Sequence, residues 1–302
     1  EKNLDMKNKN TLKTILKIVI SGSLIYYLFS KKVNISEVVE NFRSLDWRYV
    51  VLMVLVIIVH YTISSLRWKS LLIHEKSGEV SQLYLLKLYF EGAFFNNFMP
   101  TSIGGDVYKI VKLGRKIDDP ATGFSSVFTE RFTGILMLFL IGLLSLGKQL
   151  GWGVLVLIIW LISGFYIGMY VLKVLSKKIG FVRKIYDALM VYKNYPKVLF
   201  FAMFTSLVIQ LLAILTQYLA FMAGGIKLPV FYSLMAFPII TLAGFFIPSI
   251  NGIGVQDAMY ASMFSFVGVS VDVAVSMSIV YHIVRMGVSL IGGILYALDK
   301  ES

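Results

Sequence analysis

The stretch NNFMPTSIGGD, residues 96–106, decides how this chain folds. It interrupts an apolar run that begins near residue 83, and basic residues return directly after it, at 109–116. Proline and glycine end helices, and a broken helix at membrane depth is tolerated only where protein or a watery cavity surrounds it. The pattern predicts two half-helices, within residues 83–116, that enter a membrane from the cytoplasmic side and return to it around a cavity.

A second break, FIPSINGIGVQD at residues 246–257, repeats the pattern in the other half of the chain. Pro248 and Gly252 have the same spacing as Pro100 and Gly104. By the predicted topology the two hairpins enter from opposite sides, which makes an inverted-topology repeat with breaks that meet near the midplane. Such repeats are typical of transporters, because the two halves can exchange conformations. The alternative is that two unrelated hairpins merely share a Pro/Gly turn.

The composition excludes an ordinary soluble protein. Of the 302 residues, 57 % are hydrophobic and only 15 % are charged, against about 25 % charged in soluble domains. We therefore expect an all-α integral membrane protein with about six full transmembrane helices and two re-entrant broken-helix hairpins in an inverted-topology repeat. The absence of cysteine excludes disulfides and thiol chemistry, and three scattered histidines have no metal-ligand spacing. No cofactor or metal is expected.

The predicted organisation is one membrane domain that covers residues 1–302. The full spans are expected near residues 14–30, 49–66, 123–146, 153–172, 198–222 and 273–298. The parts of the domain are a first span and connector (1–48), a first repeat (49–147, hairpin 83–116), a span and basic cytoplasmic loop (148–197) and a second repeat (198–298, hairpin 231–267).

The net charge of +12 indicates topology rather than nucleic-acid binding. Most of the 29 Lys and Arg residues fall in short segments that the predicted spans place on one side. Cytoplasmic loops are enriched in Lys and Arg. We expect a multi-pass protein of the cytoplasmic membrane, with both termini in the cytoplasm.

The breaks predict anion binding. A half-helix that starts at a break leaves its first backbone N–H groups unpaired and carries partial positive charge, so its tip attracts anions. In the empty state hydroxyl and amide side chains are expected to cap these groups; they are Thr101, Ser102, Ser249 and Asn251. Asn96 and Asn97 offer further polar contacts. Capping alone is the alternative explanation.

Two aspartates oppose that expectation. Asp106 and Asp257 lie in the first turn after each break, where a carboxylate repels a phosphate. A cation must offset each, and Arg131 and Arg285 are the candidates. A charged residue at mid-bilayer costs roughly 2.5–3.5 kcal/mol and usually pairs or lines a pathway. Arg285 lies one turn beyond His282 in the last span.

Three further charged residues have competing interpretations. Glu130 and Arg131 form a candidate binding pair, or a structural ion pair near the membrane edge. Glu91, in the incoming arm of the first hairpin, pairs with Arg131 or Arg285, or carries a proton. Arg67 with Trp68 at the end of a span is typical of an interfacial anchor, with the guanidinium reaching the headgroups.

These residues resemble a known family, the transmembrane, flippase-like region of lysylphosphatidylglycerol synthases and its stand-alone relatives. The resemblance covers nearly the whole chain and is carried by Arg67-Trp68, residues 96–100 and 104–109, Glu130-Arg131, Pro248 and residues 252–258. Two positions depart from the family pattern: Lys109 stands where the family often has Arg, and Gln256-Asp257 where it often has Arg-Glu. The resemblance implies movement of an aminoacylated anionic lipid to the outer leaflet. The soluble aminoacyl-transfer domain of the full synthases is not in this sequence.

The leading hypothesis is translocation of a phosphate-bearing lipid, such as phosphatidylglycerol, its lysyl ester or a polyprenyl phosphate. The headgroup is expected at the breaks, with Arg131 and Arg285 neutralising phosphate. The expected substrate-binding residues are Asn96, Asn97, Pro100, Thr101, Ser102, Gly104, Asp106, Lys109, Glu130, Arg131, Pro248, Ser249, Asn251, Gly252, Gly254, Asp257, His282 and Arg285. Glu91 and Arg67 are candidates for coupling or pairing.

Two alternatives stay open. One is a membrane enzyme or enzyme subunit of lysyl-phosphatidylglycerol synthesis or glycolipid modification, and the other is a secondary transporter for a small solute. The sequence offers no Gly-x-Ser-x-Gly elbow and no soluble-type phosphate loop, so no catalytic residue is assigned. The expected partner is a lipid with a phosphate headgroup. A glycosyl- or aminoacyl-transferase and a second copy of the chain are further candidate partners, and nucleic acid is not.

Overall fold

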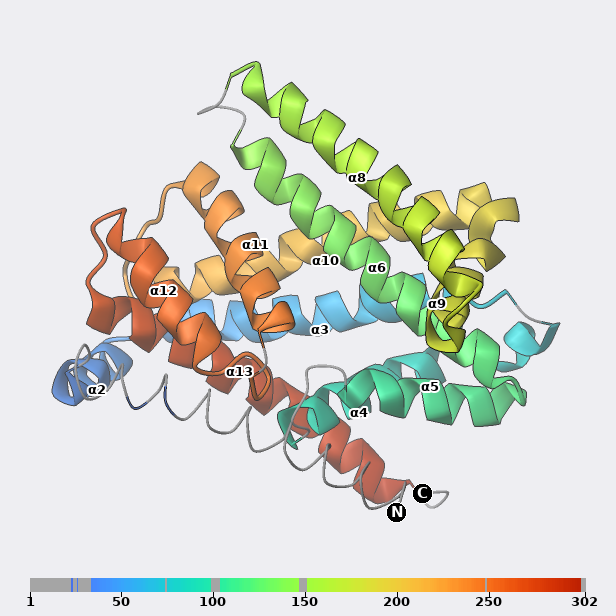
Figure 1. Cartoon of the computed structure of the whole chain (residues 1–302). Coiled ribbons are helices and arrows are strands. Elements are labelled where there is room, and N and C mark those ends of the chain that lie inside the picture. The colour runs from blue at the N-terminus through green and yellow to red at the C-terminus, as the bar shows by residue number, and fades with distance from the viewer. Residues whose placement is uncertain are drawn as a thin grey trace, which may run out of the picture. The chain divides into compact units, whose positions relative to one another are not determined.

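A computed structural model shows a helical protein (Figure 1). It describes Ser23, Tyr26 and residues 34–73, 75–98, 104–146, 151–247 and 249–299. The helices, in chain order, are α2 (Ile35–Arg43), α3 (Trp47–Ser70), η1 (Glu75–Glu79), α4 (Gln82–Phe98), α5 (Gly104–Ile117), α6 (Pro120–Ser145), α8 (Gly153–Ser176), α9 (Gly180–Met190), η2 (Val191–Asn194), α10 (Pro196–Ala223), α11 (Val230–Phe246), α12 (Val255–Ser265) and α13 (Val271–Leu298).

Five of these helices are long and apolar enough to cross a membrane. They are α3, α6, α10 and α13 over their full lengths, and α8 from Leu155 to Ser176. Each coincides with one of the predicted spans, which confirms an all-α membrane protein. The sixth predicted span, near residues 14–30, lies outside the described residues except for Ser23 and Tyr26.

The first break separates two antiparallel helices. The Tyr84 hydroxyl on α4 donates to the Lys112 carbonyl on α5 at 3.4 Å. Closer to the break, a Cβ added to Gly105 would lie 2.0 Å from the Gly92 carbonyl oxygen, so only glycine permits this approach. The break residues Pro100, Thr101 and Ser102 lie outside the described residues.

The second break also separates two antiparallel helices, α11 and α12, and the Tyr232 hydroxyl donates to the Met263 carbonyl across them. The loop between them uses left-handed backbone at three positions, Asn251 (φ 50°), Gly252 (φ 85°) and Gly254 (φ 83°). Glycine adopts such angles without a Cβ penalty, and asparagine tolerates them better than most residues. Pro248 lies outside the described residues.

Two segments that we predicted as connectors contain short helices. The basic loop 173–197 holds α9 and η2, and the connector 31–46 holds α2, which starts where the Asn34 side chain accepts from the Ser36 N–H at 3.1 Å. Both helices are amphipathic and bury little, mainly Ala188 in α9 and Val38 in α2. Short amphipathic helices have no long apolar run, which is why a search for spans passes over them.

The chain divides into two compact units. Unit 1 contains residues 1–59, 90–105 and 213–302, and unit 2 contains residues 60–89 and 106–212. In unit 1, α12 packs against α11 and α13, and α13 packs against α2. In unit 2, α6 packs against α8 and α9. The predicted repeat boundaries stay a prediction.

Each unit has its own buried core. In unit 1 the ring centres of Phe221 and Phe264 lie 4.5 Å apart, and these rings pack with those of Phe237 and Tyr260. In unit 2 the Tyr192 hydroxyl donates to the Leu71 carbonyl at 2.8 Å. Burial raises the pKa of Tyr192, so this phenol remains a hydrogen-bond donor across the physiological pH range.

Candidate functional site

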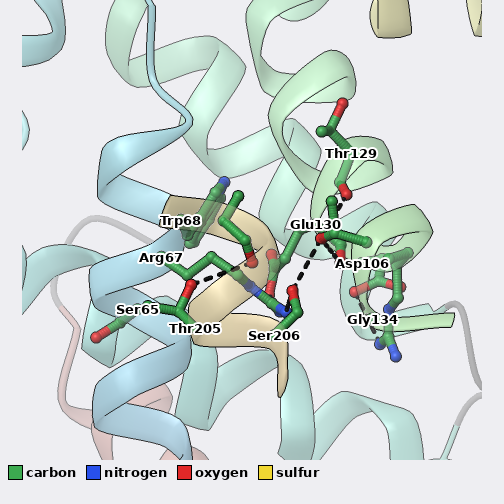
Figure 2. A network of polar contacts seen from close by, with 12 residues as sticks. Ser65, Arg67, Trp68, Asp106, Thr129, Glu130, Gly134, Thr205 and Ser206 are labelled. Carbon is green, nitrogen blue, oxygen red and sulfur yellow. Dashed lines mark hydrogen bonds and ion pairs between the residues drawn. The ribbon is translucent and has the colours of Figure 1, made fainter. Parts of the chain in front are cut away.

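Unit 2 contains a cluster of five ionisable side chains from three helices, here called the charge cluster (Figure 2). Arg67 comes from α3, Asp106 and Lys109 from α5, and Glu130 and Arg131 from α6. Four of the side chains are 3–6 % exposed, whereas Arg131 exposes 42 %. The cluster is thus buried except at the guanidinium of Arg131.

Arg67 and Glu130 form the buried centre of the cluster. Arg67 Nη2 lies 2.7 Å from Glu130 Oε1, and Arg67 Nη1 donates to Ser206 Oγ at 2.7 Å. The Ser206 hydroxyl in turn donates to Thr133 at 2.9 Å. The prediction that Arg67 is an interfacial anchor is therefore wrong. Its guanidinium is buried and pairs with a carboxylate of another helix instead of reaching the headgroups.

Arg131 makes a bidentate contact with Asp106. Arg131 Nε lies 2.6 Å from Asp106 Oδ2, and Nη2 lies 3.0 Å from Oδ1. This confirms that Arg131 offsets the aspartate after the first break. Glu130 and Arg131 bind different partners, so the alternative of a structural pair between them is wrong. Adjacent residues on a helix do not face each other.

Lys109 connects the two ion pairs. Its ammonium nitrogen lies 3.2 Å from Glu130 Oε2 and 3.4 Å from Asp106 Oδ1. It also lies 4.1 Å from the centre of the Tyr89 ring and 5.0 Å from that of Trp68. Trp68 is fully buried and donates from Nε1 to Ser126 at 3.0 Å, so its predicted place at the headgroups is also wrong.

The charge cluster is not electrically balanced. It contains three cations and two carboxylates, and so carries one positive charge in excess when all five groups are ionised. The exposed member, Arg131, is the group through which that charge can reach a ligand. The arrangement can therefore hold one anionic group, and its geometry suits a phosphate or carboxylate.

Unit 1 contains a second polar cluster, here called the Asp–His cluster: Asp257 on α12 with Ser278 and His282 on α13. Asp257 Oδ1 accepts from the Ser278 hydroxyl at 2.5 Å and lies 3.4 Å from His282 Nε2. Asp257 Oδ2 accepts from the Gly254 N–H at 2.8 Å. The expected counter-ion, Arg285, does not pair with Asp257. The histidine one turn earlier on α13 lies beside the carboxylate instead.

Arg285 instead contacts the second break. Its Nη2 donates to the Asn251 carbonyl at 2.9 Å, and its guanidinium lies 5.2 Å from the centre of the Tyr281 ring. In the described part of the chain no carboxylate pairs with it. Arg285 is half-buried, so its positive charge is held at the break by a neutral acceptor.

The two breaks are joined within unit 1. Asn251 Nδ2 donates to Asn97 Oδ1 at 2.9 Å, and Asn97 Nδ2 donates to Ser289 at 2.6 Å. Asn96 Oδ1 accepts from the Gly105 N–H at 2.7 Å and so covers one of the first N–H groups of α5. Gly104 is buried at the start of the same helix.

The predicted caps at the second break are wrong. The Ser249 hydroxyl donates to the Ile247 carbonyl at 3.3 Å, and the Asn251 amide binds Asn97. The cap is supplied by Asp257, whose carboxylate accepts from the Gly254 N–H. Gly252 lies beside Gln256, and a Cβ added to Gly252 would meet that side chain at 2.8 Å.

Glu91 is fully buried on α4, where the Phe90–Glu91 backbone lies against Gly292 of α13. Its predicted partners contact other groups: Arg131 binds Asp106, and Arg285 binds the Asn251 carbonyl. Its pairing or coupling role stays a prediction. Among the described residues no group of three His, Asp or Glu could hold a metal ion.

Sequence reasoning missed the hydroxyl residues that complete both clusters, namely Ser126, Thr133, Ser206 and Ser278. They lie in apolar spans, where a buried hydroxyl usually binds a neighbouring helix, and that signal could have found them. Glu130 carried a second signal. Because it cannot face Arg131, it needed a cation from another helix.

The match to known proteins extends over nearly the whole chain. The sequence model of the family described as lysylphosphatidylglycerol synthase TM region matches residues 14–293. Comparison with curated proteins and with solved structures gives no match. The match includes every residue of the charge cluster and of the Asp–His cluster. The chain therefore belongs to the lysylphosphatidylglycerol synthase transmembrane-region family.

Proposed function

We propose that this protein moves an anionic, phosphate-bearing lipid between the leaflets of the cytoplasmic membrane. The observation that supports this most is the excess positive charge of the buried charge cluster, which is exposed at Arg131. An uncompensated charge among apolar helices is costly, so such residues usually pair or line a pathway. A phosphate headgroup would supply the missing negative charge.

Charge favours a lipid whose headgroup is negative overall. Phosphatidylglycerol and a polyprenyl phosphate bring a phosphate without a cation. The lysyl ester of phosphatidylglycerol adds two ammonium groups, which would need acidic contacts of their own. In the charge cluster both carboxylates already hold cations. We therefore rank phosphatidylglycerol and polyprenyl phosphate above the lysyl ester.

The two helical hairpins and the family support transport. Broken helices that bring polar backbone and asparagine side chains together are typical of transporter binding sites. The Asn97–Asn251 hydrogen bond joins the ends of the two hairpins in this way. Membership of a family named for a lipid-synthase membrane region favours a lipid over a small solute. The enzyme-subunit alternative has no comparable support, because the carboxylates of the charge cluster are already held by cations.

The test is a flipping assay with the purified chain in vesicles. Headgroup-labelled phosphatidylglycerol, its lysyl ester or a short polyprenyl phosphate is placed in both leaflets, and a membrane-impermeant quencher reports inner-leaflet lipid as it becomes exposed. We expect faster exposure of the first or third lipid. Arg131→Gln should abolish the acceleration, since it removes the exposed cation. Arg183→Gln is the matched control, because Arg183 is 74 % exposed in the same unit and pairs loosely with Asp187.

Each outcome has a meaning. Acceleration that Arg131→Gln abolishes and Arg183→Gln leaves intact supports translocation through the charge cluster. Acceleration that persists in both variants would mean that translocation does not depend on the charge cluster. No acceleration with any lipid, in protein that unfolds cooperatively, overturns the proposal in favour of the enzyme-subunit alternative.

A further inference from the structure

We propose that Asp257 and His282 form a proton-binding site that is coupled to an anion at Arg285, so that a proton and a phosphate headgroup bind together. The headgroup in this inference rests on the proposed function. The proton site itself rests on the geometry of α12 and α13, and on the contrast between the counter-ions of two buried aspartates.

Asp257 has a histidine as its ion-pair partner, whereas Asp106 has a permanently charged arginine. Two cations, Arg131 and Lys109, lie within 3.4 Å of Asp106. Among the described residues the ion-pair partner of Asp257 is His282, at 3.4 Å. Arginine stays charged at all physiological pH values, but histidine changes charge near neutral pH. The partner of Asp257 is thus a side chain that can exist with or without charge, whereas the arginine beside Asp106 is always charged.

The contacts of His282 leave room for both protonation states. Its side chain is 7 % exposed, and among the described residues neither ring nitrogen has a hydrogen-bond partner. The 3.4 Å separation from Asp257 exceeds that of a normal hydrogen bond, so the imidazole is not locked in one tautomer. Two other donors, the Ser278 hydroxyl and the Gly254 N–H, hold the carboxylate in place whether His282 is neutral or charged.

Arg285 provides the coupling. It lies three residues after His282 on α13, and side chains at this spacing lie on one helix face about 5–6 Å apart. A charged His282 and Arg285 would be like charges that repel each other at that distance. Arg285 is held by a backbone carbonyl, and no carboxylate among the described residues pairs with it, so its charge is available to an anion. An anion there removes the repulsion, and His282 then takes up a proton.

Other charged and titratable groups on the packed helices do not replace this pair. Tyr260 on α12 donates to Gln217 of α10, Tyr232 of α11 donates to a backbone carbonyl, and Tyr281 lies against Arg285. On α2, Asn41 donates to the Ser276 hydroxyl. The charged residues of α2 are exposed; they are Glu37, Glu40 and Arg43. At the start of α13, Asp272 accepts from the Asn34 N–H. Glu91 of α4 is buried along α13 and belongs in the same test.

The experiment measures proton uptake on anion binding by the full chain in detergent. The probe is water-soluble short-chain phosphatidylglycerol, titrated by calorimetry in buffers of different ionisation enthalpy between pH 5.5 and 8.5. These pH limits bracket the ordinary histidine pKa of about 6.5. We expect wild type to take up as much as one proton per bound probe. Its affinity should then fall by up to about tenfold per pH unit on the alkaline side.

The variants assign the proton. His282→Gln should bind the probe with no uptake and with a flat pH dependence. His60→Gln, which changes the histidine of α3 in the other unit, is the matched control and should behave as wild type. Glu91→Gln tests the other buried acid and should leave uptake unchanged. Asp257→Asn removes the carboxylate in case His282→Gln does not fold, and it too should lower uptake.

Two results would overturn the inference. Binding without proton uptake at any pH contradicts the coupling but leaves the proposed function standing, because the headgroup still binds. Uptake that persists in both His282→Gln and Asp257→Asn places the proton elsewhere. Failure of the probe to bind is a separate result, because it contradicts the headgroup on which both proposals rest and not the coupling alone.

Discussion

Asp106 in unit 2 and Asp257 in unit 1 are each the third residue of the helix that follows a break, but they are neutralised by different means. Asp106 accepts two hydrogen bonds from the Arg131 guanidinium and lies 3.4 Å from the Lys109 ammonium nitrogen, within the charge cluster. Asp257 relies on a hydroxyl, one backbone N–H and a histidine. The first arrangement places a permanently charged arginine on the carboxylate, whereas the second uses a histidine as the ion-pair partner.

The largest effect should come from opening the charge cluster at its centre. Glu130→Gln keeps the shape of the side chain but removes the carboxylate that pairs with Arg67. Lys109 then has one neighbouring carboxylate, that of Asp106, instead of two. Breaking a buried ion pair on one side costs about 3–5 kcal/mol. We expect a loss of that size in the free energy of unfolding, measured by denaturant titration in a fixed micelle. A loss under 1 kcal/mol would mean that the cluster is open to water.

The second-largest loss of stability is expected where α13 closely approaches α4 in unit 1. A Cβ on Gly292 would lie 1.9 Å from the Phe90 carbonyl oxygen, so Gly292→Ala must push the helices apart. Overpacking of this kind costs about 1–3 kcal/mol. Gly287→Ala on the same helix meets nothing within 4 Å and should instead stabilise by roughly 0.5–1 kcal/mol. Thermal unfolding of both variants tests this, and equal melting temperatures would contradict it.

A smaller effect is expected at the Asp–His cluster. Asp257→Asn retains an oxygen that can accept from Ser278 or Gly254, and it removes a charge whose counter-ion can become neutral. We expect a cost of about 1 kcal/mol, the net value of a hydrogen bond. The comparison with Glu130→Gln under the same conditions is decisive. Equal losses in the two variants would contradict the distinction between fixed and titratable counter-ions.

The smallest effect belongs to the exposed pair Asp46 and Arg48 at the start of α3, which contrasts with both buried clusters. Arg48 lies 2.8 Å from Asp46, and the hydrogen bond lowers the pKa of the Asp46 carboxyl. A lowered pKa adds stability above the ordinary aspartate value, and this is lost as pH falls through the lowered pKa. Asp46→Asn should therefore be slightly less stable than wild type at neutral pH, and the difference should vanish as pH falls through the lowered pKa. A change at neutral pH larger than that of Asp257→Asn would contradict this order.

The sequence predicted the helices well because their signals are local. Long apolar runs located the five described spans, and the Pro/Gly breaks located both hairpins. It also named Arg131 and Arg285 as the cations available to offset the two aspartates, and Arg131 does pair with Asp106. It did not predict the short amphipathic helices α2 and α9, whose apolar faces are too brief to read as spans.

What the sequence by itself determined is that this is a helical membrane protein with two broken helices and a set of charges near them. Only the tertiary structure decided which charges meet. It placed Arg67 against Glu130, enclosed Lys109 between Tyr89 and Trp68, and gave Asp257 a histidine rather than Arg285. The physical reason is that spans apolar around their whole circumference carry no pattern that fixes their rotation, so the facing residues are set by packing between helices.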